Sequence, residues 1–147
     1  MELRSIMAYK PLSVPPNETV TRAAAKMRDA NVGCLVVTSG GMVAGIITDR
    51  DLVVRCLSRA GEGNHRLEEC TVADHMTQPV ITARPDMDIL EAAHLMTQQE
   101  VKRLPVVHGE DVMGLVSMSD VAQALDRPVH DLLVGMGAAR RLPATIG

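Results

Sequence analysis

The chain repeats itself at a fixed offset of 69 residues. No gap is needed to keep the two copies in register, and the matches run from near the start of the chain to Asp120. Matched pairs include Val20/Ile89, Ala23/Ala92, Ala24/Ala93, Met27/Met96, Gly45/Gly114 and Asp51/Asp120. A repeat that holds its register over this length indicates two copies of one structural unit. Each unit has roughly 60 residues, too few to bury both faces of its own sheet well, so the two must pack together.

Each copy predicts the same β-α-β-β-α order. Helical periodicity, capped by Thr19 and Asp88, follows an extended stretch, and two short apolar runs joined by a Gly turn indicate a hairpin. A second helix follows from Asp49 and from Met118. The expected extended segments are 12–14 and 80–83, and the expected hairpin strands are 34–38, 42–48, 104–107 and 112–117. We therefore expect an α+β fold whose two repeats pack face to face with pseudo-two-fold symmetry.

Four segments follow from this pattern. We expect repeat one over 1–60, a polar connector over 61–71, repeat two over 72–127, and a C-terminal helix and tail over 128–147. The helix in that last segment is predicted over 130–136.

Composition narrows the class of protein. Apolar residues make up 46% of the 147 residues, and no apolar run approaches the length of a membrane span or a signal peptide, so a soluble cytoplasmic protein is expected. The net charge of −3 disfavours nucleic-acid binding. The chain contains ten Met but no Phe or Trp, and Tyr9 is the one aromatic residue.

Both hairpins end in one motif: Gly, two apolar residues, Thr or Ser, two variable residues, Asp. It spans 45–51 and 114–120. A Thr or Ser before a helix is a typical N-cap, and an Asp three residues later suits the positive end of the helix. The same carboxylate could accept hydrogen bonds from a ribose diol, so capping and ligand binding both remain open. Glycine inside a strand indicates either a bulge or a close backbone approach.

These two motifs, with the strand Arg103-Leu104-Pro105-Val106-Val107, resemble the tandem CBS-domain pair, or Bateman module, over residues 3–127. The resemblance implies an adenosine compound, such as AMP, ADP, ATP or S-adenosylmethionine, bound between the repeats. It implies that Thr48, Asp51, Ser117 and Asp120 contact phosphate and ribose. It also implies an adenine pocket with walls from Val14, Leu35, Ile81 and Pro105 and backbone hydrogen bonds from Ser13 and Thr82.

The two expected clefts differ in charge. Face-to-face packing would place Thr48 and Asp51 with Lys102 and Arg103, and Arg50 close by. Ser117 and Asp120 would then face Gly33 and Cys34, without a cation. Because a phosphate gains most from paired cations, the first cleft is expected to be the tighter site.

Metal and catalytic sites are not predicted. The spacing of Cys56, His65, Cys70 and His75 matches no standard zinc set, and His65 and Cys70 fall in the polar connector, where solvated side chains are expected. Cys34 lies in an apolar strand and is interpreted as a core thiol. No catalytic motif is present, so the chain is not expected to be an enzyme or to require a cofactor.

The sequence thus predicts a regulatory module that senses adenine nucleotides, as in energy sensing, and acts as a homodimer on a downstream partner that the sequence does not name. A structural or interaction protein with vestigial clefts is the alternative.

Overall fold

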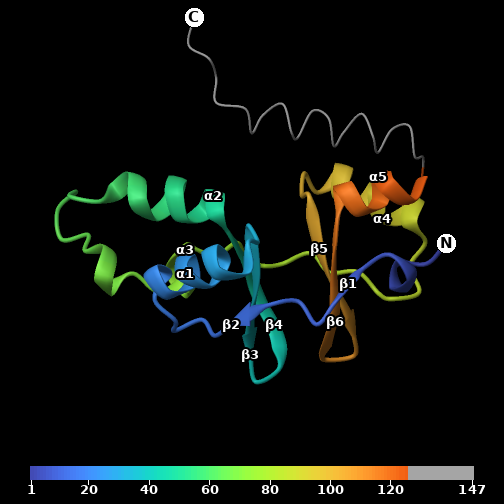
Figure 1. The fold of residues 1–147 in the computed structure, drawn as a ribbon, viewed down its shortest axis with the longest axis horizontal. Helices are drawn as coiled ribbons and strands as arrows, with labels where there is room; N and C mark the ends of the chain where they lie inside the picture. Colours follow the sequence, from blue (N-terminus) through green and yellow to red (C-terminus); the bar gives the residue numbers. More distant parts are fainter. Residues whose placement is uncertain (126–147) are drawn as a thin grey trace, which may run out of the picture.

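Two small sheets lie side by side in the middle of the molecule, with the helices to the outside (Figure 1). A computed structural model describes residues 1–125. The predicted helix over 130–136 and the tail lie outside these residues. One sheet has the order β2-β3-β4, and the other β1-β6-β5. The strands are β1 (Ala8–Tyr9), β2 (Ser13–Val14), β3 (Cys34–Ser39), β4 (Met42–Thr48), β5 (Arg103–His108) and β6 (Asp111–Ser117). The helices are α1 (Val20–Ala30), α2 (Asp49–Asp51), α3 (Val72–His75), α4 (Ile89–Gln98) and α5 (Met118–Leu125).

The two hairpins confirm the predicted repeat. Cys34 pairs with Thr48 in β3–β4 and Arg103 pairs with Ser117 in β5–β6, the same register 69 residues apart. Both hairpins also carry a register shift at the same place, after Val37 and after Val106. The caps are confirmed as well: the Thr19 hydroxyl accepts from the Arg22 amide, and the Asp88 carboxylate accepts from the Leu90 amide.

The second helix differs between the repeats. In repeat two it is the regular helix α5, whereas in repeat one α2 makes a single turn and continues as the π-helix η2 (Leu52–Cys56) and the 3-10 turn η3 (Leu57–Arg59). Two further 3-10 turns are η1 (Leu3–Ser5) and η4 (Leu67–Glu69). The extended segment expected over 80–83 forms no strand, only a parallel bridge between Ala83 and Val106.

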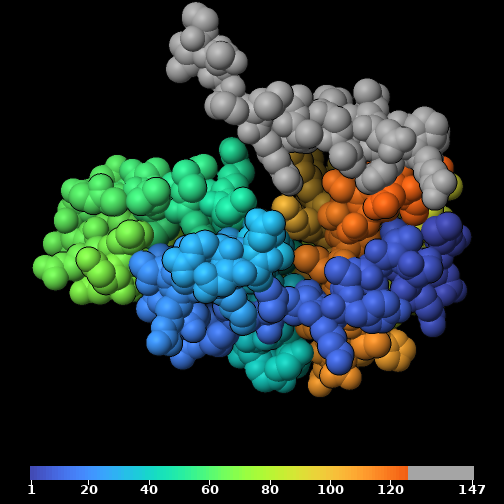
Figure 2. Space-filling view, viewed as in Figure 1, coloured from blue at the N-terminus to red at the C-terminus, as the bar shows by residue number. Residues whose placement is uncertain are grey.

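The first nine residues pack on the second repeat, although the sequence assigns them to the first. Strand β1 pairs with β6, and Leu3 and Met7 are buried in the core of repeat two. Figure 2 shows these residues, in blue, against the orange atoms of repeat two. The exchange is reciprocal, because Thr77, near the start of repeat two, bridges to Ile46 in β4 of repeat one. Residue 60 therefore does not separate two independent packing units.

This exchange explains the glycine of each motif. Gly114 lies against Met7 and Ala8, and Gly45 lies against Met76 and Thr77, the equivalent residues of the other repeat. The close approach expected from a glycine inside a strand is confirmed. What approaches is the exchanged backbone segment. The alternative expectation, a bulge, is also met, because the register shift of each hairpin lies directly beside the glycine.

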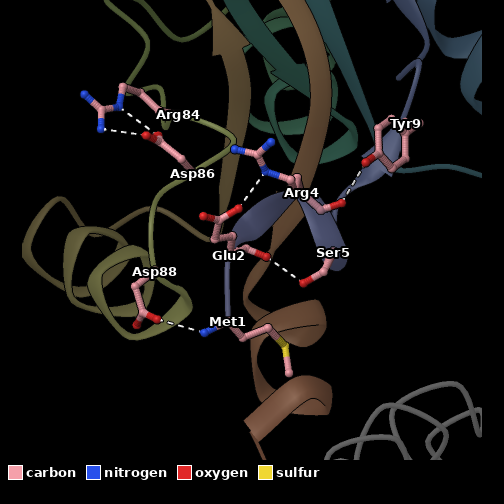
Figure 3. A network of polar contacts seen from close by, with 8 residues as sticks. All are labelled: Met1, Glu2, Arg4, Ser5, Tyr9, Arg84, Asp86 and Asp88. Atoms are coloured by element: carbon pink, nitrogen blue, oxygen red, sulfur yellow. Dashed lines mark hydrogen bonds and ion pairs between the residues drawn. The ribbon is translucent and has the colours of Figure 1, made fainter.

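Polar contacts surround the N-terminal segment where it meets the second repeat, and one of them, from Met1 to Asp88, joins the two (Figure 3). The Met1 nitrogen lies 3.1 Å from Asp88 Oδ2, at the start of α4, and the Tyr9 hydroxyl donates to the Arg4 carbonyl at 2.8 Å. Arg84 forms a two-pronged pair with Asp86 in the loop that faces this segment. These groups are exposed, so they orient the segment, and most of its stabilisation comes from Leu3 and Met7.

We expect Asp88→Asn to weaken the acid dependence of stability. The Leu90 amide, donating to the Asp88 carboxylate, lowers the pKa of Asp88. A lowered pKa contributes stability above the ordinary carboxyl pKa, and that stability is lost as the pH falls towards the lowered value. Asn still caps the helix but does not titrate. Melting temperatures measured from neutral pH to about pH 2 should fall less in this variant. The control is Glu110→Gln, in an exposed hairpin turn; an equal change in both variants would contradict the prediction.

Candidate functional site

The motif of repeat one forms a complete capping box. The Thr48 hydroxyl accepts from the Asp51 amide at 3.1 Å, and Asp51 Oδ2 accepts from the Thr48 amide at 2.9 Å. The second oxygen, Oδ1, lies 3.5 Å from Arg55 Nε. Asp51 is 9% exposed. Capping is therefore a real role of this carboxylate, and a ligand would have to approach Oδ1 beside Arg55.

The motif of repeat two has the same geometry without the arginine. Asp120 Oδ2 accepts from both the amide and the hydroxyl of Ser117 at 2.7 Å, and the Asp120 amide donates back to the hydroxyl at 3.2 Å. The position equivalent to Arg55 is Ala124. Asp120 thus lacks the arginine that lies beside Asp51 at the equivalent position.

We expect Asp51→Ala to lower the free energy of unfolding by about 0.5–2 kcal/mol, because the Thr48 amide loses its acceptor in a half-buried turn. Urea unfolding followed by circular dichroism measures the change. The control is Asp49→Ala, in the same turn but exposed and not bonded to Thr48, which should cost no more than a few tenths of a kcal/mol. Equal losses in both variants would mean that the box contributes nothing.

A cleft of about 150 Å³ lies between the repeats beside this motif. It brings Thr48 at the end of β4 together with Ile81, Lys102 and Arg103 from repeat two. The complete lining is Ile46, Thr48, Thr77, Pro79, Val80, Ile81, Val101, Lys102 and Arg103. Thr48 thus meets the two cations as expected, whereas Asp51, which was expected with them, is not among the residues that line this cleft.

A second, more open hollow of about 510 Å³ adjoins the first. It includes Thr82 and shares Pro79 and Val80 with the cleft. Small-molecule sites usually have roughly 300–1,000 Å³, so the cleft reaches that size only together with the hollow beyond Pro79 and Val80.

Three expected adenine-contacting residues lie elsewhere. Leu35 and Pro105 are completely buried and Val14 is 4% exposed. Leu35 and Val14 pack in the core of repeat one, whereas Pro105 lies on the face of β5 opposite the core residues Leu104 and Val106. The prediction that they form walls of an open cleft is not supported, because strands β3 and β5 bury apolar side chains on both faces. Ser13 is half-buried, and its carbonyl accepts from Lys26 Nζ at 2.6 Å.

The charges are also arranged differently from the expectation. Arg50 is exposed and does not line the cleft of Thr48. Burial raises the pKa of the Cys34 thiol to about 11, and the nearby Arg103 guanidinium offsets part of this effect. Cys34 is therefore a protonated core thiol at neutral pH, as predicted. Arg103 lies close to the strand start of repeat one as well as in the cleft, so the region of Cys34 does not lack a cation.

The four residues that sequence reasoning rejected as a zinc set, Cys56, His65, Cys70 and His75, form a cluster around the connector. Cys70 is 5% exposed and His65 is half-buried, so the interpretation of both as solvated is wrong. His65 Nε2 lies 3.4 Å from Cys70 Sγ and 3.1 Å from the Cys56 carbonyl. His75, at the end of α3, completes the group.

No helix among residues 1–125 is both long enough and apolar enough to span a membrane.

Comparison with known proteins identifies the two repeats. The family model "CBS domain" matches residues 3–58 and 72–127. The chain is 30% identical over 120 residues to the CBS domain-containing protein YhcV of Bacillus subtilis, covering 82% of each chain. A signal-transduction protein with CBS domains from Burkholderia ambifaria has a similar structure, with a TM-score of 0.72 and 27% identity over 82% of this chain and 85% of that one.

The CBS domain pair of protein MJ0100, solved with 5-methylthioadenosine and S-adenosyl-L-methionine, also matches. Its TM-score is 0.73 and its identity 25%, over 84% of this chain and 94% of that one. The family match, the relatives and the exchanged β-α-β-β-α architecture agree, and the chain belongs to the CBS-domain family, with two copies of the domain.

Proposed function

We propose that this protein is a regulatory module that binds an adenosine compound, most simply an adenine nucleotide, between its two CBS domains. The observation that carries the proposal is the cleft in which Thr48 of one repeat meets Lys102 and Arg103 of the other. A hydroxyl and two cations suit a phosphate, since charge-assisted hydrogen bonds are the stronger ones. The bound adenosine compounds of MJ0100 support the class of ligand.

Ribose recognition falls to Asp51 in this proposal. Its Oδ2 is used by the capping box, so a ribose hydroxyl would bond Oδ1, in competition with Arg55. Asp120 has no equivalent arginine. The two carboxylates therefore offer ribose different environments, and we propose that Asp51 and Asp120 bind it with unequal affinity.

The adenine ring would lie on aliphatic side chains. Ile46, Val80 and Ile81 line the cleft, and Thr82 lines the adjoining hollow. Because no aromatic side chain lines either one, base recognition would rely on aliphatic contacts and backbone hydrogen bonds.

Isothermal titration with AMP, ADP, ATP, adenosine and S-adenosylmethionine tests the proposal. The double variant Lys102→Ala/Arg103→Ala should weaken nucleotide binding by at least about tenfold and leave adenosine binding nearly unchanged. The control Arg22→Ala/Arg28→Ala removes the same charge from the exposed face of α1. If the ligand is recovered from the complex without chemical change, the result fits a regulatory role and not catalysis. Absence of binding would favour the alternative, an interaction module with vestigial clefts, and equal losses in both double variants would reduce the effect to net charge.

We further propose that the chain forms a homodimer through its helices. An apolar groove of about 380 Å³ lies over α1 and η2, beside Ala24, Val53 and Leu57. Val53 and Leu57 are 55% and 52% exposed beside this groove, and contiguous exposed apolar surface marks contact sites. Light scattering at micromolar concentration should give twice the mass of one chain, and a monomer with and without nucleotide would overturn this proposal.

A further inference from the structure

We propose that Cys56, His65, Cys70 and His75 form a tetrahedral binding site for a divalent metal of the zinc type. One ligand atom from each residue can be chosen so that all four lie within 4.8 Å of one another. Two thiols and two imidazoles are a donor set that Zn²⁺ prefers, and one that Mg²⁺ and Ca²⁺ do not.

The distances fit such a site closely. Zinc bonds of about 2.3 Å to sulfur and about 2.0–2.1 Å to nitrogen place neighbouring S and N ligands roughly 3.6 Å apart and two sulfurs roughly 3.8 Å apart. His65 Nε2 lies 3.4 Å from Cys70 Sγ and 3.9 Å from Cys56 Sγ, on either side of that value. The four ligand atoms are at most 4.8 Å apart, so a contraction of about 1 Å in the longest of these separations would complete the tetrahedron.

Four different segments supply the ligands. Cys56 ends the π-helix η2, His65 lies in the connector, Cys70 follows the 3-10 turn η4, and His75 ends α3. The π-helix marks the one place where repeat one departs from the regular second helix of repeat two, and π turns are frequent at functional sites. This departure ends on the Cys56 ligand.

Burial makes the cluster difficult to explain as solvated polar groups. Cys56 is 1% exposed, Cys70 5% and His75 7%. The two histidine rings do not stack: their centroids are 5.9 Å apart and their planes meet at 82°. Rings at this separation and angle can each direct a nitrogen to a common point. Burying an imidazole costs free energy unless the ring is bonded. If packing were the sole role of this small core, beside Val20 and Leu67, apolar residues would fill it without that cost.

Closed sites with four protein ligands are structural sites. Here the metal would hold the connector against the end of η2 and against α3. The position of repeat two equivalent to Cys56 is Leu125, and no second four-ligand group occurs in residues 1–125. The metal would thus stabilise one end of the molecule.

Metal analysis of the full chain, loaded with Zn²⁺ and then dialysed without chelator, tests the site. One zinc per chain is expected. Substitution with Co²⁺ should give the intense visible bands of tetrahedral cobalt and a thiolate-to-cobalt charge-transfer band. Cys70→Ser should weaken zinc binding by more than about 100-fold, since loss of even an outer-shell partner costs 10–100-fold.

The chain offers matched controls. Cys34→Ser changes the third cysteine, buried in β3 away from the cluster, and His94→Gln changes a histidine on α4; both should keep one zinc and the cobalt spectrum. If Cys70→Ser does not fold, His65→Gln decides, because His65 is half-buried in the connector and should alter the cobalt spectrum without loss of the fold. The proposal would be overturned if the chain retained no zinc, or if the cobalt spectrum were octahedral. It would also be overturned by equal effects in ligand and control variants, or by a Cys56–Cys70 disulfide that persists in the presence of reductant.

Discussion

Leu3→Ala is expected to lower the free energy of unfolding by about 2–5 kcal/mol, a large part of the roughly 5–15 kcal/mol that stabilises a typical domain. The side chain is completely buried in the core of repeat two, in one cluster with Met96, Leu104 and Val116. Truncation would leave a cavity among elements that lie nearly a hundred residues further along the chain.

Urea unfolding followed by circular dichroism measures this loss. The matched control is Leu12→Ala, nine residues later in the same N-terminal stretch but 39% exposed, which should cost less than about 1 kcal/mol. If the two variants lose the same stability, the N-terminal segment does not contribute to the second core, and the exchange between repeats is not a major source of stability.

The elements themselves could be predicted because their causes are local. The hairpins follow from apolar runs separated by Gly40 or Gly109, and the caps from Thr19 and Asp88, each within a few residues of its effect. The 69-residue repeat adds a second, independent signal for each element, since an element expected in one copy is expected in the other.

Exchange of the N-terminal segment could not be predicted in this way. Ala8 pairs with Leu115, and neither residue carries a signal for a partner so distant in sequence. The one signal present was Gly114, which indicates a close approach but not what approaches.

The cleft was predicted in part. Pseudo-symmetry places the end of β4 opposite the start of β5, which is why Thr48 meets Lys102 and Arg103. The expectation that Val14, Leu35 and Pro105 contact adenine came from the family resemblance, which does not take their burial in this chain into account. Leu35 is followed directly by two more buried valines in β3, a continuous apolar run that indicates a strand buried on both faces.

The connector cluster shows the limit of spacing arguments. Standard zinc patterns have ligands within one or two turns of chain. Here Cys56 in η2 and His75 in α3 are separated by the two short turns η3 and η4, and only their packing brings the donor atoms together. The polar composition of the connector indicated exposure, although Cys70 within it is buried.

Gly45→Ala and Gly114→Ala are each expected to cost about 1–3 kcal/mol, although alanine favours a strand no less than glycine. A β-carbon on Gly45 would lie 2.9 Å from the Thr77 carbonyl oxygen, and one on Gly114 would lie 2.9 Å from the Ala8 carbonyl oxygen. A methionine side chain could move aside, but these oxygens belong to backbone that is itself paired with the strand, so the exchanged segment would have to separate from it.

Gly33→Ala separates this effect from the general cost of replacing glycine. A β-carbon there would lie 3.0 Å from Asp49 Oδ2, the end of an exposed and flexible side chain, so less than about 0.5 kcal/mol should be lost. Thermal and urea unfolding of the three variants give the comparison. Because the contacts of Gly45 and Gly114 are related by the repeat, their losses should be similar in size. A loss at one glycine alone would mean that the two exchanged segments contribute unequally, and no loss at either would mean that the strands accommodate a methyl group where the structure places backbone.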